Sequence, residues 1–240
     1  MLRVAVAGAL GRMGRVAVPA LQGADGIEYA GGFARARVPG DRVTDDLHEL
    51  LHAQPDVVLD LTTHPGTVEI SMSALEHGVR PVIGATGWTR PERDALDALA
   101  RERGLAAMLV PNFSIGACLM MRFAEEAARF FPTAEIIEMH HDKKKDAPSG
   151  TALLTAQGIA AAGGPAEPPI HSIRLRGAMA HQEVRFGTDG EMLTVRHDAL
   201  SRESYVPGML ACVKAVMHLT PGLHVGMPFD ALRPAQDDNG

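Results

Sequence analysis

Short apolar runs alternate with helical patterns along the first hundred residues of the chain. The first run, residues 4–7, has the pattern of a buried strand and leads into a glycine-rich turn, after which apolar residues recur at helical spacing. Further strand patterns follow, separated by helical stretches, at 27–33, 56–61, 80–83 and 105–110. This alternation predicts an α/β domain with a Rossmann-like, doubly wound parallel sheet.

The pattern changes beyond residue 113. A helical stretch over 115–131 precedes an alternating strand that ends at two histidines, and a second helix follows Pro148. Three more strand patterns come next, at 172–175, 182–186 and 192–196, before helical periodicity returns over 204–219. We therefore expect a dinucleotide-binding domain over 1–113, completed by the segment 203–240. A smaller α+β domain with a mixed open sheet, for substrate binding and oligomerisation, is expected over 114–202.

Composition narrows the class of protein. The chain has 240 residues, 46% of them hydrophobic, and a net charge of −6, which disfavours a nucleic-acid surface. No segment reaches the roughly 18 apolar residues that span a bilayer, and the N-terminus has no export signal. Cys118 and Cys212 lack metal-ligand spacing, so we expect no disulfide, no metal site and a cytoplasmic protein without membrane contact.

The turn after the first predicted strand carries Gly8, Gly11 and Gly14 in a GxxGxxG pattern. This spacing is a variant of the dinucleotide fingerprint, in which small residues let the backbone approach a pyrophosphate at a helix N-terminus. Loops at 62–64, 84–87 and 111–114 follow three later strands and should lie at the same sheet edge. Each loop alone could be an ordinary turn, but together they favour a ligand site.

The end of the second predicted strand usually distinguishes the two nicotinamide cofactors, because an acidic residue there binds the ribose hydroxyl and an arginine favours the 2′-phosphate. Arg35 and Arg37 stand at this end, whereas Glu28 lies at the start of the strand. We therefore expect NADPH to be preferred, with NADH also accepted. The alternative is that both arginines are merely exposed to solvent.

Residues 138–154, EMHHDKKKDAPSGTALL, combine two histidines, three lysines and a helix start. His140 and His141 end a strand, so their side chains should point to opposite faces. Ser149 is a natural N-cap, and a capped helix start binds carboxylate or phosphate. Proton transfer to an anionic substrate is one reading of this cluster. The other is a satisfied strand histidine beside a solvated lysine turn.

With these motifs assembled, the chain resembles the dihydrodipicolinate reductase family over nearly its full length. The resemblance rests on the block 138–154 and on five further stretches, VAVAGALGRMGR at the start, GATG at 84–87, PNFSIG at 111–116, AHQEVRFG at 180–187 and HDALSRESYVPG at 197–208. It implies a nicotinamide-dependent reduction of 4-hydroxy-tetrahydrodipicolinate, with loss of water, in lysine and diaminopimelate biosynthesis. It also implies a homotetramer.

The resemblance also implies roles for individual residues. His140 matches the family's catalytic acid/base, Lys144 its proton donor, and His141, Gly150 and Thr151 its contacts with the small dicarboxylate substrate. The implied cofactor contacts, beside the Arg35 inferred above, are Gly8, Ala9, Leu10, Gly11, Arg12, Met13, Gly84, Ala85, Thr86, Val110, Pro111, Asn112 and Phe113. The chain departs from the family pattern at Ala34, where many members carry Glu, which disfavours strong NADH use.

Two other functions remain open from the sequence. Another Rossmann dehydrogenase acting on an amino or oxo acid would share the first domain and would differ in its substrate. A non-catalytic nucleotide sensor would bind NADPH but leave the cluster from His140 to Thr151 without a role.

Overall fold

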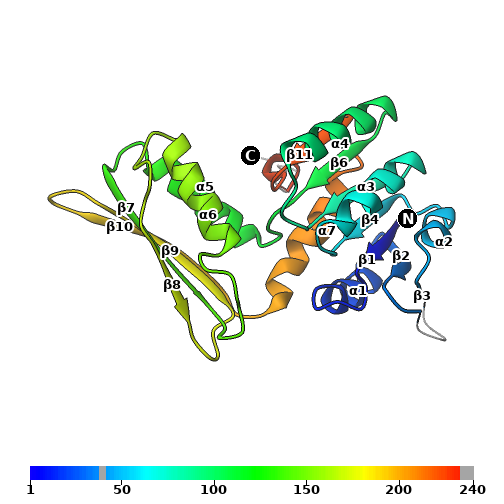
Figure 1. Cartoon of the computed structure of the whole chain (residues 1–240), viewed down its shortest axis with the longest axis horizontal. Helices are drawn as coiled ribbons and strands as arrows, with labels where there is room; N and C mark the ends of the chain where they lie inside the picture. The colour runs from blue at the N-terminus through cyan, green and yellow to red at the C-terminus, as the bar shows by residue number, and fades with distance from the viewer. Residues whose placement is uncertain (38–41, 233–240) are drawn as a thin grey trace, which may run out of the picture. The chain divides into compact units, whose positions relative to one another are not determined.

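The computed structural model of the chain describes residues 1–37 and 42–232 (Figure 1). Its internal contacts divide it into two units. Unit 1 comprises Met1–Phe113 and the chain from Tyr205 onwards, and unit 2 comprises Ser114–Ser204. Residues 233–240, the end of the expected C-terminal segment, lie outside the described residues.

Unit 1 is built on a parallel sheet. Within the described residues it has seven strands in the order β11-β6-β5-β4-β1-β2-β3. They are β1 (Leu2–Ala7), β2 (Ile27–Phe33), β3 (Val43–Thr44), β4 (Val57–Asp60), β5 (Arg80–Ile83), β6 (Ala106–Leu109) and β11 (Gly222–Val225). The order reverses between β1 and β4, which is the switch point where doubly wound sheets bind ligands. The predicted Rossmann-like parallel sheet is therefore confirmed.

Helices cover both faces of this sheet, as Figure 1 shows. The helices of unit 1 within the described residues are α1 (Gly14–Gln22), α2 (Leu47–His52), α3 (Gly66–Glu76), α4 (Arg90–Glu102), α7 (Val206–Ala215) and α8 (Phe229–Leu232). Val4 and Val6 of β1 pack in one core cluster with residues of α1 and α7, whereas Ala5 and Ala7 pack in another with residues of α2 and α3. Both faces of β1 are buried, which is why its sequence is a continuous apolar run.

Two strands of this sheet were not predicted from the sequence. β3 has only two residues, too few to show a period of two. β11 has four residues and follows the predicted C-terminal helix; it pairs with β6 at the sheet edge. The predicted strands at 27–33 and 80–83 have the observed bounds of β2 and β5.

Unit 2 contains a separate mixed sheet in the order β10-β9-β7-β8. β7 runs parallel to β8 and antiparallel to β9, and β9 is antiparallel to β10. The elements of the unit are α5 (Ile115–Ala127), β7 (Thr133–His140), α6 (Gly150–Ala161), β8 (Ile170–Arg174), β9 (Ala180–Gly187) and β10 (Met192–Ala199); a short 3-10 helix, η1 (Arg202–Tyr205), follows. This architecture confirms the expected smaller domain with a mixed open sheet.

α5 and α6 lie side by side on one face of the unit 2 sheet (Figure 1). Ile136, Val184 and Phe186 on this face pack with Ala124 of α5 and Ile159 of α6. Because side chains alternate along a strand, Glu138 and His140 of β7 share this covered face.

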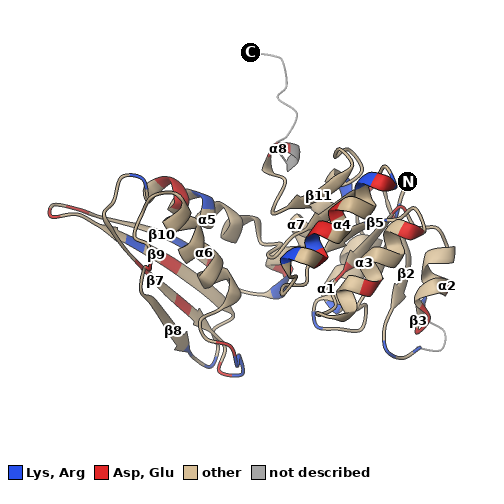
Figure 2. Cartoon of the chain, turned by 45° about the horizontal axis from the view of Figure 1, so that its top comes forward, with Lys and Arg blue, Asp and Glu red and all other residues tan. Residues whose placement is uncertain are grey.

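The opposite face of the same sheet receives neither helix. Ile137 and Met139 of β7 lie on it, with Ile173 opposite Met139 on β8. Charged side chains of β9 and β10 continue this face, where Arg196 pairs with Glu183 and Asp198. Figure 2 shows these mixed charges along the strands.

Two predicted helices are shorter than their sequence patterns. The first ends at Ala127 instead of 131, because the chain tightens there into a turn in which Phe130 N donates to Ala127 O, just before Pro132. The last begins at Val206 instead of 204, after η1, and ends at Ala215. Apolar spacing persists through these turns, so the sequence pattern alone extends the helices too far.

Candidate functional site

The turn between β1 and α1 is closed tightly around its glycines. Gly8 has φ +81°, in the left-handed region, and a Cβ there would lie 3.0 Å from the Leu61 backbone. A Cβ at Gly14 would lie 2.3 Å from the carbonyl oxygen of Gly8. Only glycine fits at these two positions. The N-cap residue of α1 makes no side-chain hydrogen bond to the helix start. The turn that holds the residues from Gly8 to Met13 therefore leaves a helix start suited to a pyrophosphate.

Other predicted cofactor residues follow the carboxyl ends of β5 and β6, at the same sheet edge as this turn. Gly84 N donates to Asp60 O at 2.8 Å, and Val110 N donates to Ile83 O at 2.8 Å. A Cβ at Gly84 would lie 2.7 Å from Cε2 of Phe113, so the two loops adjoin. The structure thus brings the loops of Gly84 to Thr86 and Val110 to Phe113 together within unit 1.

A buried carboxylate at this edge was missed by the sequence analysis. Asp60, the last residue of β4, is 0% exposed and accepts hydrogen bonds from the backbone and hydroxyl of Thr62 and from the hydroxyl of Thr67, at 2.9, 2.6 and 2.6 Å. Burial raises the pKa of the Asp60 carboxyl, and the hydrogen bonds only partly offset that effect. Asp60 thus orders the loop after β4. The sequence signal that could have identified it is an acidic residue at the end of an apolar strand.

The two arginines beyond β2 differ in their surroundings. Arg37 donates to Thr44 Oγ1 at 2.9 Å and pairs with Glu49 and with Asp45. Arg35 is exposed and makes no hydrogen bond or ion pair within the described part of the chain. Arg37 is therefore occupied by its own carboxylates, whereas the guanidinium of Arg35 is available to a ligand.

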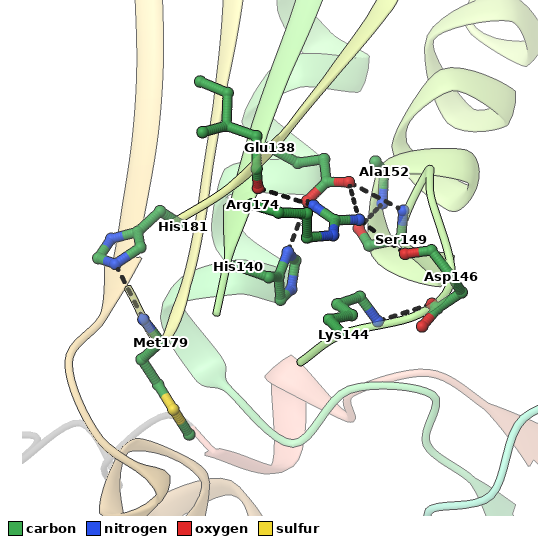
Figure 3. A network of polar contacts seen from close by, with 10 residues as sticks. Glu138, His140, Lys144, Asp146, Ser149, Ala152, Arg174, Met179 and His181 are labelled. Atoms are coloured by element: carbon green, nitrogen blue, oxygen red, sulfur yellow. Dashed lines mark hydrogen bonds and ion pairs between the residues drawn. The ribbon is translucent and has the colours of Figure 1, made fainter. Parts of the chain in front are cut away.

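In unit 2, the polar network of Figure 3 centres on Glu138. Its carboxylate is 0% exposed and accepts two hydrogen bonds from Arg174 of β8, at 2.8 and 3.0 Å. His140 Nδ1 lies 2.5 Å from Glu138 Oε2, and Ser149 N donates to Glu138 Oε1 at 3.3 Å. One buried carboxylate thus joins two strands and the start of α6.

The network sets the charge of both groups. Burial alone raises the pKa of Glu138, but hydrogen bonds from Arg174, Ser172 and His140 outweigh it, so this pKa lies below its ordinary value. Burial lowers the pKa of His140, as do the nearby charges of Lys144 and Arg174, and Glu138 offsets this only in part. At neutral pH the site therefore holds an ionised Glu138 and a neutral His140.

Lys144 lies in the loop between β7 and α6. Its ammonium donates to Asp146 Oδ2 at 2.6 Å, as Figure 3 shows, and its side chain is 20% exposed. Lys143 and Lys145 are exposed and make no hydrogen bond or ion pair within the described ranges. Among the three lysines, Lys144 is the one that the fold holds in place, and it also influences the pKa of His140.

The start of α6 agrees with the pattern read from the sequence. Ser149 is the N-cap, and its hydroxyl accepts from Ala152 N at 3.2 Å. Gly150 is exposed, with open space where a Cβ would be, and Thr151 follows it in the first turn. His141 stands just beyond the end of β7, where its carbonyl accepts from Lys144 N. All five predicted catalytic and substrate residues therefore lie within one strand end, loop and helix start of unit 2.

Glu138 and Arg174 were missed as parts of this site. The available signal for Glu138 was its position two residues before His140 on a strand, which places both on one face. Arg174 could not be found in this way, because its place opposite His140 depends on the pairing of β7 with β8. Both cysteines are buried and neither forms a disulfide, and no group of three or more His, Cys, Asp or Glu side chains in the described ranges could hold a metal ion.

Comparison with known families gives two matches that together span nearly the whole chain. The family model for the N-terminus of dihydrodipicolinate reductase matches residues 2–113, and the model for its C-terminus matches residues 116–228. Curated proteins named 4-hydroxy-tetrahydrodipicolinate reductase are similar throughout. The one from Geobacillus kaustophilus is 43% identical over 91% of this chain and 95% of its own length, and the one from Streptomyces griseus 43% over 94% and 96%.

Solved structures give the same result. Dipicolinate-bound dihydrodipicolinate reductase from Paenisporosarcina sp. TG-14 is 39% identical, with a TM-score of 0.85, over 94% of this chain and 98% of that chain. An amine dehydrogenase from Mycobacterium smegmatis is 16% identical with a TM-score of 0.68, over 93% and 94%. The second likeness reports the fold alone.

Proposed function

The chain belongs to the dihydrodipicolinate reductase family, and from this premise we propose how its residues reduce 4-hydroxy-tetrahydrodipicolinate to tetrahydrodipicolinate with loss of water. This is a nicotinamide-dependent step of lysine and diaminopimelate biosynthesis. The observation that carries the assignment of residues is the cluster of His140, Lys144 and the start of α6 around one buried carboxylate.

Unit 1 is the part of the chain that fits the nicotinamide cofactor. Its glycine turn has no room for side chains at Gly8 and Gly14, as a closely approaching pyrophosphate requires. We assign the cofactor contacts to the turn from Gly8 to Met13 and to the loops from Gly84 to Thr86 and from Val110 to Phe113. When bound, a reduced nicotinamide supplies the hydride for ring carbon 4 of the substrate.

NADPH is the preferred cofactor in this proposal. Arg35 is exposed and unpaired within the described residues, so it can bind a 2′-phosphate without breaking an existing ion pair. Arg37 would first have to leave Glu49 and Asp45. Ala34 stands where a carboxylate would otherwise bind the ribose hydroxyl of NADH.

The start of α6 binds the substrate carboxylates. Backbone N–H groups at a helix start and the helix dipole both favour an anion, and Gly150 leaves this end open. We assign Gly150, Thr151 and His141 as substrate contacts, beside the ammonium of Lys144. The dicarboxylate class agrees with the dipicolinate bound by the Paenisporosarcina relative.

His140 and Lys144 transfer protons. Reduction at ring carbon 4 moves electron density toward the ring nitrogen, which must then receive a proton. The protonated ammonium of Lys144 is a donor, and the neutral imidazole of His140 can accept and return a proton near neutral pH. Substrate binding orients the ring, and these two groups then donate protons to it and accept protons from it.

Two further properties complete the proposal. The uncovered sheet face of unit 2, with Ile137, Met139 and Ile173, pairs with other copies of the chain, giving a homotetramer.

The protein works in the cytoplasm, where its two buried cysteines stay reduced. Among the described residues, none of the helices combines the length and the apolar character that a bilayer-spanning helix needs.

A coupled assay tests the function directly. The unstable substrate is generated in the cuvette by the synthase that precedes this step, and oxidation of NADPH or NADH is followed by absorbance. We expect oxidation as soon as the synthase is active, with a higher kcat/KM for NADPH. Reactions without the synthase are the control. Failure to oxidise either cofactor would contradict the proposal, and turnover of a simple amino or oxo acid instead would indicate a different dehydrogenase.

A further inference from the structure

Glu138 has no role in the reaction as described above, yet it is the most buried charged group of unit 2. Its side chain is 0% exposed, on the sheet face that α5 and α6 cover. A carboxylate removed from water is costly unless charged partners and hydrogen bonds compensate it. Because Glu138 is buried in contact with the proposed proton-transfer residue His140, its presence there needs a physical explanation.

Arg174 supplies the compensation. It lies opposite His140 in the register of β7 and β8 and donates through both terminal nitrogens to the two oxygens of Glu138, at 3.0 and 2.8 Å. Such paired hydrogen bonds fix the plane of the carboxylate as well as its charge. Glu138 therefore stays ionised and keeps one orientation.

The ionised carboxylate determines the tautomer of His140. An ionised carboxylate can only accept hydrogen bonds, so the 2.5 Å contact requires that Nδ1 of His140 carry the proton. In the neutral ring the lone pair then lies on Nε2, which has no hydrogen bond within the described residues. Nε2 is thus the atom left to exchange a proton with the substrate.

The same pair also holds the loop that carries Lys144. Arg174 Nη2 donates to the carbonyl oxygen of Asp146 at 2.6 Å, and the side chain of Asp146 accepts from Lys144 at 2.6 Å. Ser149 N donates to Glu138 at the other end of this loop. Both proton-transfer groups are therefore tied to one buried ion pair (Figure 3).

We propose that Glu138 and Arg174 are positioning residues of this reductase, which hold His140 as the Nδ1–H tautomer with Nε2 facing the substrate and hold the loop of Lys144 in place. The inference rests on the proposed roles of His140 and Lys144 and adds two residues that act through them.

The first test uses the wild-type protein and needs no enzyme activity. In protein with ¹⁵N-labelled histidine, the His140 signals are identified by their absence in His140→Asn. We expect the nitrogen shifts of a neutral ring protonated at Nδ1 at pH 7. A ring protonated at Nε2 would overturn the proposal whether or not the protein is a reductase.

The second test is kinetic. Glu138→Gln keeps the size of the side chain and removes its charge. Glu138→Asp keeps the charge on a side chain that is one methylene group shorter. Misplacing a catalytic group by about 1 Å can cost about 100-fold in rate, so we expect kcat to fall about 10- to 100-fold in both, with KM within about threefold. Glu135→Gln is the matched control, because Glu135 pairs with His171 at 2.9 Å on the same two strands but is exposed. Its kcat should be unchanged.

The pH profile separates positioning from simple stabilisation. The charged groups that face His140 are Glu138 on its own strand, Arg174 on β8 and Lys144 in the loop. Without the charge of Glu138, the charged groups that still face His140 are the cations Arg174 and Lys144, which lower its pKa. We therefore expect the limb of the pH profile of kcat that reports His140 to move to lower pH by about one unit. Because Glu138→Asp retains the charge, its limb stays near that of the wild type. An unshifted limb in Glu138→Gln would refute the positioning role.

A double variant covers the case in which Glu138→Gln does not fold, since one half of a buried ion pair left alone is strongly destabilising. Glu138→Gln combined with Arg174→Met removes both charges. We expect its Tm to recover above that of Glu138→Gln while kcat stays low. Recovery of kcat along with Tm would show that the pair is purely structural. If neither variant folds, the tautomer of His140 measured in the wild-type protein tests the proposal.

Discussion

Residues of the same type in this chain differ in their partners, and we propose different roles for them on that basis. Lys144 is held by Asp146 whereas Lys143 and Lys145 are exposed, and Arg37 is held by Glu49 whereas Arg35 is not. A paired side chain has a fixed position, and an unpaired one can bind a ligand without losing a partner. The proposed function uses one residue of each kind, Lys144 for its fixed position in unit 2 and Arg35 for its availability in unit 1.

Removing either proton-transfer group should slow the chemical step. Positioned acid/base groups contribute about 10² to 10⁴ in rate, so His140→Ala and Lys144→Ala should each lower kcat by about that factor. The coupled assay at saturating NADPH measures this. Lys145→Ala, a change to an exposed lysine of the same loop, is the control and should turn over like the wild type. Near-normal kcat in both His140→Ala and Lys144→Ala would rule out these roles.

Replacing Arg35 should change cofactor selectivity. A hydrogen bond to a charged group contributes about 1.5 to 3 kcal/mol, so Arg35→Ala should raise KM for NADPH about tenfold or more and leave KM for NADH nearly constant. Steady-state kinetics with both cofactors measures the ratio. Arg37→Ala serves as the comparison, because its guanidinium already has internal partners. Equal effects of Arg35→Ala on the two cofactors would exclude Arg35 as the phosphate contact.

At the scale of elements, the residues proposed for ligand binding in each unit lie on a strand followed by a loop and a helix start. In unit 1, β1 leads through the glycine turn to α1; in unit 2, β7 leads through the lysine loop to α6. The two helix starts differ, since Met13, the N-cap residue of α1, makes no side-chain cap hydrogen bond, whereas Ser149 caps α6. We assign the uncapped start to the cofactor pyrophosphate and the capped start, through Gly150 and Thr151, to the substrate.

Removing the cap of α6 should affect both stability and ligand binding. Loss of a serine N-cap costs about 1 kcal/mol, so Ser149→Ala should lower Tm by about 2 to 4 °C and weaken binding of pyridine-2,6-dicarboxylate. Calorimetry measures both quantities. Thr89→Ala removes the comparable cap of α4 in unit 1 and should lower Tm without changing that affinity. Unchanged affinity in Ser149→Ala would remove the start of α6 from the substrate site.

At the scale of the whole molecule, the sheets of the two units differ in how they are covered. Helices bury both faces of the unit 1 sheet, and α5 and α6 bury one face of the unit 2 sheet. A sheet face that carries Ile137, Met139 and Ile173 and has no helix over it is suited to pairing with other copies. We therefore propose that unit 2 carries the surface through which copies assemble.

A charge on the uncovered face should weaken this assembly. Sedimentation velocity of the wild-type protein should give the mass of a tetramer, and Ile173→Asp should give smaller species, because Ile173 is 44% exposed on that face. Leu154→Asp is the control, with a similarly exposed leucine on α6. A monomeric wild type would contradict the proposal, as would a tetramer that Ile173→Asp leaves intact.

From the sequence alone we could predict the parallel sheet, the second α+β unit, the family and the cap at Ser149. These follow from apolar periodicity and from contiguous motifs, which local chain geometry translates directly into strands, turns and helix starts. It did not show β3 or β11, whose two and four residues are too short to display a period.

The pairing of charged side chains could be known only from the folded chain. Arg174 is 36 residues from Glu138, and it reaches the carboxylate because β8 pairs with β7 in one particular register. The contrast between Arg35 and Arg37 likewise depends on where Thr44 and Glu49 fold back beside β2. Ion pairs and buried hydrogen bonds depend on distances in space that no local pattern encodes, so partners distant in sequence became visible only in the folded chain.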